Sequence, residues 1–149
     1  MGFGEELRRR RQEAGLTQAQ LAKLAGTSQS RVSSYEAGTV EPSPRARERL
    51  LAAAKPLPGI ALHRHREEVR RLAERFRLAD VRVFGSVARH KDTRHSDIDL
   101  VVTPLAGASL FDLIAFGAHV EDLTGYPVDV VSDRGRAGDD PVLAEALAL

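Results

Sequence analysis

Two carboxylates stand one residue apart in an apolar run, and this arrangement most restricts how the chain can fold. Asp97 and Asp99 alternate with Ile98 and Leu100, just ahead of Val101-Val102. A strand over residues 97–103 would place both aspartates on one face. An unpaired carboxylate is costly to bury, and two on one face repel each other. The strand is therefore predicted to turn one apolar face to a core and one acidic face to a positively charged ligand.

A second strand, predicted over residues 128–132, supplies a further carboxylate. Its Val128 and Val130 fit the apolar face, which turns Asp129 to the side of Asp97 and Asp99 if the two strands are neighbours. Oxygen-only ligands of this kind suit Mg²⁺ or Mn²⁺. A pair of such ions can hold a nucleoside triphosphate. The predicted catalytic and metal-binding residues are Asp97, Asp99 and Asp129.

A Gly-Ser pair stands between a short strand predicted over residues 81–84 and a short helical segment predicted from residue 87 to about residue 90. Glycine lets the backbone approach a ligand closely, and the free N–H groups and the serine hydroxyl can hold phosphate oxygens. Gly85 and Ser86 are therefore predicted to bind a nucleotide. Arg89 is either a further phosphate contact or a brace for the helical segment.

The remaining pattern predicts an α/β domain with a small mixed sheet over residues 60–149. Apolar residues at helical spacing predict a helix over residues 60–78. A second helix is predicted from the capping box that begins at Ser109 to Gly125, and a last helix from Asp140-Pro141 to Leu149.

The spacing of Gly85-Ser86, ten residues, Asp97-Ile98-Asp99 and the later Asp129 resembles the minimal nucleotidyltransferases of the polymerase-beta-like superfamily. The resemblance covers about residues 60–149. It implies that Asp97 and Asp99 bind both metal ions, that Asp129 completes the site and helps to deprotonate an attacking hydroxyl, and that Gly85-Ser86 hold the triphosphate of ATP. Such proteins usually pair with HEPN toxins, which are helical ribonucleases, and the better-understood ones transfer AMP to a toxin tyrosine. One residue departs from the pattern, because His90 follows Ala88-Arg89 where the family commonly has glycine.

The first third of the chain has the pattern of a helix-turn-helix, with helices predicted over residues 4–14, 17–25, 28–37 and 44–54. Thr17 and Gln20 form a capping box, and Gly26 supplies the positive φ of a tight turn. Small Ala22 and the apolar plug Val32 suit two helices that cross at a sharp angle. Residues 4–54 closely resemble the phage-repressor/Cro-like helix-turn-helix family.

In that family the third helix lies in the DNA major groove. The resemblance implies that base contacts come from the start of this helix. The matching residues are Ser28, Gln29, Ser30, Ser33 and Ser34. Gln18 resembles the family's phosphate contact, and the side chains of Arg10, Arg11 and Arg31 either neutralise phosphates or lie on solvated helix faces.

Composition separates the two parts. Residues 1–55 hold 10 Lys/Arg against 6 Asp/Glu, and residues 56–149 hold 12 against 15, which predicts different partners for the two domains. Residues 56–59, within Lys55-Pro-Leu-Pro-Gly59, are predicted to be the linker. The chain has no cysteine, and it shows no signal peptide and no apolar run long enough to span a membrane. A cytoplasmic protein without a membrane partner is expected.

Two functions fit these patterns. In the first, the chain is an antitoxin that transfers AMP from ATP to a HEPN toxin and also binds promoter DNA, as a homodimer or as a hetero-oligomer with the toxin. In the second, it is a non-catalytic DNA-binding regulator whose nucleotidyltransferase-like domain only binds nucleotide or a partner. The presence of all three carboxylates favours the first.

Overall fold

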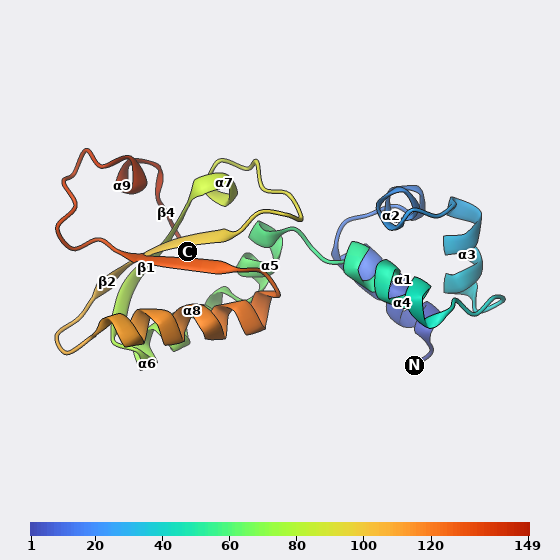
Figure 1. Cartoon of the computed structure of the whole chain (residues 1–149), viewed down its shortest axis with the longest axis horizontal. Coiled ribbons are helices and arrows are strands. Elements are labelled where there is room, and N and C mark those ends of the chain that lie inside the picture. The colour runs from blue at the N-terminus through green and yellow to red at the C-terminus, as the bar shows by residue number, and fades with distance from the viewer. The chain divides into compact units, whose positions relative to one another are not determined.

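The polypeptide folds into two compact units, Met1–Pro56 and Leu57–Leu149 (Figure 1). The structure is a computed structural model that describes all 149 residues. The division falls within the predicted linker, but Leu57–Gly59 belong to the second unit because Pro58 already opens a helix. None of the helices combines the length and the apolar character needed to cross a membrane.

The first unit is the predicted four-helix domain. Its helices are α1 Phe3–Glu13, α2 Gln18–Ala25, α3 Gln29–Ala37 and α4 Pro44–Ala53. Thr17 and Gln20 cap α2 reciprocally, and Gly26 ends it with a φ of 69°. Leu7, Leu21, Val32 and Leu50 form the fully buried centre.

A charged group is buried in this small core. The side chain of Glu36 on α3 is 0% exposed. Its Oε1 accepts a hydrogen bond of 2.5 Å from Arg11 Nε, and its Oε2 accepts bonds from Arg11 Nη2 at 3.1 Å and Gln18 Nε2 at 2.9 Å. Burial raises the pKa of the Glu36 carboxyl, but the hydrogen bonds from Arg11 and Gln18 outweigh it, so the pKa lies below its ordinary value. Glu36 therefore ties α1 and α2 to α3 as a buried anion.

The second unit combines helices with a mixed sheet, as predicted, and the sheet has four strands rather than the three predicted. Its helices are α5 Pro58–Arg64, α6 Arg66–Arg75, α7 Gly85–Ala88, α8 Leu110–Thr124 and α9 Pro141–Glu145. Its strands are β1 Leu78–Phe84, β2 Ile98–Pro104, β3 Val128–Ser132 and β4 Leu147–Ala148. The order is β3-β2-β1-β4, with β2 and β3 parallel and the other pairs antiparallel.

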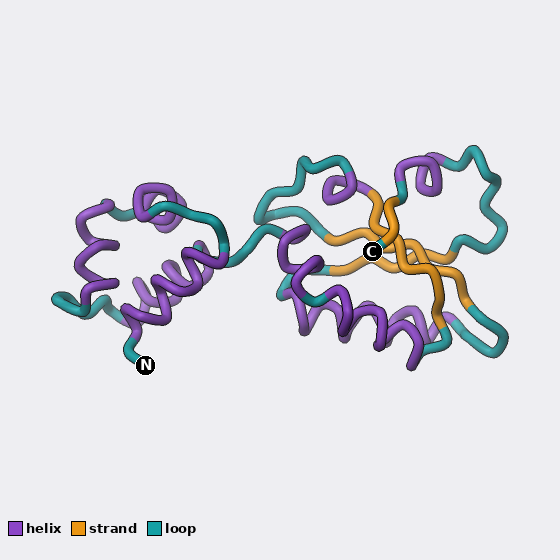
Figure 2. Tube along the Cα trace, turned by 180° about the vertical axis from the view of Figure 1, so that it is seen from behind, coloured by secondary structure: helices purple, strands orange, loops and turns teal.

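The two faces of this sheet differ. The longer helices α6 and α8 lie on one side, while the short helices α7 and α9 lie on the other (Figures 1 and 2). Ile98, Leu100 and Val102 of β2 pack with Phe116 of α8 and Val69 of α6 in the core. The intervening residues of β2 face α7 and α9, so the alternation of the sequence decides which side carries the aspartates.

Two of the predicted helices are shorter in the structure than the sequence predicted. The helix predicted over residues 60–78 is broken at His65 into α5 and α6 and ends at Arg75. Strand β1 then begins at Leu78 rather than at residue 81 and contains an irregularity between Ala79 and Arg82, which hides its two-residue period.

The last helix is also shorter than predicted, because α9 ends at Glu145. Leu147–Ala148 form β4, in which Ala148 pairs with Arg82 and Leu147 with Val83 of β1. The alanine- and leucine-rich end of the chain has a helical propensity, and pairing with the free edge of β1 overrides it.

Replacing Glu36 with glutamine should lower the free energy of unfolding of the first unit by about 3 kcal/mol, because Arg11 would lose its only buried counter-charge. The pKa of Glu36 is lowered in the folded state, so its stabilisation is present at neutral pH and is lost as the pH falls through the folded pKa. The difference from the wild type should therefore shrink in acid. Urea denaturation of the full chain, followed by circular dichroism at several pH values, measures both effects.

Glu41→Gln is the matched control, because Glu41 is 70% exposed in its ion pair with Arg47. It should change the free energy of unfolding by about 0.5 kcal/mol or less. Equal losses in the two variants would contradict a structural role for the buried anion.

Candidate active site

The three predicted aspartates lie at the same end of the neighbouring strands β2 and β3, a region here called the carboxylate edge (Asp97, Asp99 and Asp129). The parallel register of β2 and β3 pairs Asp99 directly with Asp129. Their side chains therefore share a face, on strands about 4.8 Å apart. Asp97 lies one residue before β2. Asp99 is half-buried, while Asp97 and Asp129 are exposed.

Gly85 closes this edge from the end of β1. Phe84 is the antiparallel partner of Asp99, so the next residue lies beside the Asp99 carboxylate. Gly85 has a φ of 71°, and a Cβ added to it would lie 2.2 Å from Asp99 Oδ2. A side chain is therefore excluded there by backbone conformation and by space.

The electrostatics of the carboxylate edge favour a cation. Burial raises the pKa of the Asp99 carboxyl, and the charges of Asp129 and Asp97 raise it further, against the opposing charge of Arg89. The oxygen-only donor set fits a hard divalent ion. No group of three or more carboxylates or imidazoles is already drawn together as a metal-ligand cluster. The fit therefore depends on the exposed Asp97 and Asp129 moving toward Asp99.

Two of the residues predicted to bind phosphate, Gly85 and Arg89, both donate hydrogen bonds to a glutamate that the sequence analysis did not identify. Glu145 of α9 accepts a 2.9 Å hydrogen bond from Gly85 N through Oε1 and another of 2.9 Å from Arg89 Nη1 through Oε2. Ser86 lies next to them and is half-buried. Glu145 stands 60 residues beyond Gly85, in the stretch for which only a last helix was predicted. Only the tertiary arrangement of α9 could reveal its role.

His90 takes up the strained conformation that a glycine would adopt freely. Its φ is 56°, in the left-handed region, and its N–H donates to the Val87 carbonyl at 3.1 Å. This geometry gives a physical reason for the glycine that the family commonly carries after Ala-Arg. His90 is exposed and also lines the hollow described next.

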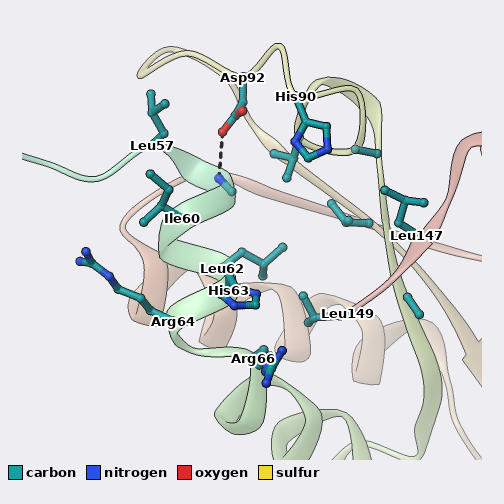
Figure 3. A pocket seen from close by; sticks show the side chains of 15 residues that line it. Leu57, Ile60, Leu62, His63, Arg64, Arg66, His90, Asp92, Leu147 and Leu149 are labelled. Carbon is teal, nitrogen blue, oxygen red and sulfur yellow. Dashed lines mark hydrogen bonds between the residues drawn. The ribbon is translucent and has the colours of Figure 1, made fainter. Parts of the chain in front are cut away.

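A hollow of about 760 Å³ lies beside α5 (Figure 3). Its walls come from α5, from the side of α7 that carries Val87, and from the C-terminal residues Leu147 and Leu149. The Gly59 N–H donates to Asp92 Oδ2 at 2.9 Å at its rim. None of the three aspartates lines this hollow, so its size alone does not make it the nucleotide site.

In the first unit, the predicted DNA-binding residues separate into two groups. Gln29, Ser30, Arg31 and Ser33 are exposed on α3, and Ser34 is half-buried. Ser28 is exposed and also caps α3 by accepting from Arg31 N at 3.3 Å.

The other candidates are held by internal partners. Gln18 and Arg11 bind the buried Glu36, and Arg10 pairs with Glu6 at 2.8 Å. Of the predicted phosphate contacts, Arg31 thus lies nearest to the exposed start of α3.

Comparison with known proteins bears on both units. Residues 62–143 match the family model described as a nucleotidyltransferase domain. The chain belongs to this nucleotidyltransferase family. Residues 3–55 match a helix-turn-helix domain model, so both resemblances seen in the sequence are confirmed.

Individual relatives agree with this nucleotidyltransferase assignment. Two proteins of Methanocaldococcus jannaschii, both named as protein adenylyltransferases, are 32% identical over 71 residues and 33% identical over 61 residues. These matches cover 48% and 41% of this chain, and 69% and 62% of the relatives. A solved structure of a minimal nucleotidyltransferase is 41% identical, with a TM-score of 0.55, over 61% of this chain and 95% of its own.

Gly85→Ala should lower the free energy of unfolding of the nucleotidyltransferase unit by about 1–3 kcal/mol, because alanine is strained at positive φ and its Cβ displaces the Asp99 carboxylate. In an Asp99→Ala background the loss should be smaller, because only the backbone strain remains. A double-mutant cycle from denaturation curves measures this coupling.

Gly138→Ala serves as the control, because Gly138 has no atom within 4 Å of an added Cβ and no positive φ. It should change the free energy of unfolding by about 0.5 kcal/mol or less. Strict additivity of the Gly85 and Asp99 substitutions would show that the two residues do not touch in solution.

Proposed function

We propose that the chain is a Mg²⁺-dependent protein adenylyltransferase that acts as an antitoxin, and that its helix-turn-helix unit binds the promoter DNA of its own operon. The observation that carries the enzymatic part is the register of Asp99 with Asp129 beside Gly85. The names of the archaeal relatives support the same reaction class.

In the proposed reaction each residue of the site has one task. The N–H of Gly85, the hydroxyl of Ser86 and the guanidinium of Arg89 bind the triphosphate of ATP. Asp97, Asp99 and Asp129 would hold Mg²⁺ or Mn²⁺, which when bound supplies Lewis-acid stabilisation of the attacking and leaving oxygens.

Asp129 also has a second task in this proposal, because it is exposed at the open edge strand. It accepts the proton of the acceptor hydroxyl as that oxygen attacks the α-phosphorus. A new P–O bond forms to the acceptor, the bond to the β-phosphate oxygen breaks, and pyrophosphate leaves. Positioning of the two reactants supplies much of the rate.

The acceptor is proposed to be a tyrosine of a HEPN-type toxin, as the resemblance to minimal nucleotidyltransferases implies. The openness of the carboxylate edge supports a protein acceptor, because both Asp97 and Asp129 are exposed and can be reached by a side chain on another molecule.

The DNA-binding part rests on the exposed start of α3. Gln29 can pair with adenine through two hydrogen bonds, and the hydroxyls of Ser30 and Ser33 can serve several bases. A homodimer, or a hetero-oligomer with the toxin, would present two such helices to a palindromic site.

A non-catalytic regulator is the second candidate, and two observations favour it. His90 is strained at a position where the family commonly has glycine, and the carboxylates are not preassembled as a metal cluster. In that case the nucleotidyltransferase unit only binds nucleotide or a partner.

The adenylyltransferase proposal predicts that mixing the protein, Mg-ATP and its cognate toxin adds one or more AMP units to the toxin. Asp99→Asn should abolish this addition and leave complex formation intact, because Asp99 faces the carboxylate edge. Asp122→Asn, which removes an exposed aspartate on α8, should transfer AMP like the wild type. Intact-mass spectrometry of the toxin is the measurement. A toxin that is silenced by binding but never modified would favour the regulator.

The DNA-binding proposal predicts that Gln29→Ala weakens binding to the promoter by about 1–3 kcal/mol and relaxes the base preference at one position. Arg31→Ala should instead weaken binding to all sequences and reduce the salt slope by about 1. Fluorescence anisotropy with promoter and random duplexes at several salt concentrations separates the two effects. Equal affinity of the wild type for both duplexes would contradict specific recognition.

A further inference from the structure

The side chain of Glu145 occupies two hydrogen-bond donors that, in the proposed reaction, bind the phosphates of ATP. Its two oxygens accept from Gly85 N and Arg89 Nη1, both at 2.9 Å. A carboxylate and a phosphate are bound by the same donors, namely backbone N–H groups and guanidinium. One N–H cannot serve both acceptors at full strength. Occupation by Glu145 and occupation by a triphosphate are therefore competitive.

The chain holds Glu145 in this place from both sides. Asp140 begins α9 and accepts from Val142 N at 2.8 Å, and Arg136 pairs with Asp140 at 3.2 Å. After Glu145, the backbone of β4 pairs with β1, and Leu149 N donates to the Val81 carbonyl at 3.1 Å. The carboxylate is thus delivered to Gly85 and Arg89 by a short segment that is fixed at both ends.

The side chain can nevertheless leave without unfolding this segment. It is 31% exposed, and the contacts that fix β4 are made by the backbone of residues 147–149 rather than by Glu145. A rotation of the side chain alone would release Gly85 N and Arg89. A ligand can therefore displace Glu145 at the expense of two hydrogen bonds.

Attraction to the carboxylate edge does not explain the position of Glu145. Its negative charge acts on Asp99 in the same direction as those of Asp129 and Asp97, so it adds to the repulsion there. The Gly85 N–H and the Arg89 guanidinium are the groups that bind its carboxylate, and both lower the pKa of the Glu145 carboxyl. An anion that binds together with divalent cations would replace the repulsion between Glu145 and the aspartates by attraction between the aspartates and those cations.

We propose that Glu145 determines which anions the site accepts, by acting as an internal competitor for Gly85 and Arg89. This inference rests on the proposed nucleotide site at the carboxylate edge. A triphosphate carries several negative charges and binds divalent cations, so it displaces a single carboxylate. A monophosphate carries at most about two negative charges and holds divalent cations less well than a triphosphate, so it displaces Glu145 less readily. Glu145 thereby lowers the apparent affinities of ATP and AMP by the same factor, which leaves the strongly bound triphosphate in place and the weakly bound monophosphate unbound.

The test compares the full-length wild type with Glu145→Gln by isothermal titration calorimetry. The ligands are Mg-ATP, AMP and inorganic tripolyphosphate with Mg²⁺. Loss of the competing charge should tighten binding of tripolyphosphate and Mg-ATP by about tenfold, as expected when a mostly occupied site becomes available. AMP should gain a similar factor, because an internal competitor weakens every ligand of the same two donors equally.

Two further variants keep the result interpretable. Asp139→Asn removes the same charge from an exposed position nearby and should bind like the wild type. Glu145→Asp keeps the charge but is one methylene shorter, so it cannot span both donors and should fall between the wild type and Glu145→Gln. Circular dichroism of each variant verifies folding, and Glu145→Asp alone decides the matter if Glu145→Gln does not fold.

The outcomes separate this inference from the proposed function. Unchanged or weaker binding of tripolyphosphate in both Glu145 variants would overturn the inference, while AMP transfer to the toxin by the wild type would leave the proposed function standing. Tighter tripolyphosphate binding in Glu145→Gln, with no AMP transfer by any variant, would support the inference and remove the enzymatic function.

Discussion

The contact between the backbone of Gly85 and the carboxylate of Asp99 is the constraint on which the second unit depends. It requires glycine at the end of β1. A Cβ at this position would lie 2.2 Å from Asp99 Oδ2, and the φ of 71° is unfavourable for other residues. The contact also fixes the register, because Phe84, Asp99 and Asp129 lie side by side across three strands. The aspartates repel one another at this point. The site is therefore built to be completed by positive charge, and its chemistry follows from that need.

The sequence predicted the features that are coded locally. Capping boxes, glycines at positive φ and the alternation around Asp99 depend on neighbours within a few residues, and the helix-turn-helix, the mixed sheet and the facing of Asp129 followed from them. Two features depend instead on residues far apart in the chain. The pairing of Leu147–Ala148 with β1 and the bond from Gly85 to Glu145 join segments about sixty residues apart. No local period in the sequence marks either one.

The roles of single charged residues were the hardest to predict for the same reason. Gln18 resembled the phosphate contact of the helix-turn-helix family, and Arg11 was expected either to neutralise a phosphate or to lie on a solvated helix face. The structure gives both a partner in Glu36, a glutamate that the sequence shows only as one charge in α3. A side chain that reaches a buried partner and one that faces solvent have the same local pattern. Only the packing of α1, α2 and α3 distinguishes them.

Glu36 and Glu145 show that a carboxylate bound by similar donors can be a fixed part of the fold at one position and displaceable by a ligand at another. Each glutamate is bound through both oxygens by arginine and by one neutral N–H donor, and Glu36 has a second arginine, Arg8, at 3.5 Å. The Glu36 side chain is 0% exposed, so no solute can compete for its donors, and removing it leaves a buried cation unpaired. The Glu145 side chain is 31% exposed beside an open edge, where water and anions can replace it at little loss. Burial therefore decides which of these two glutamates is part of the framework and which can give way to a ligand.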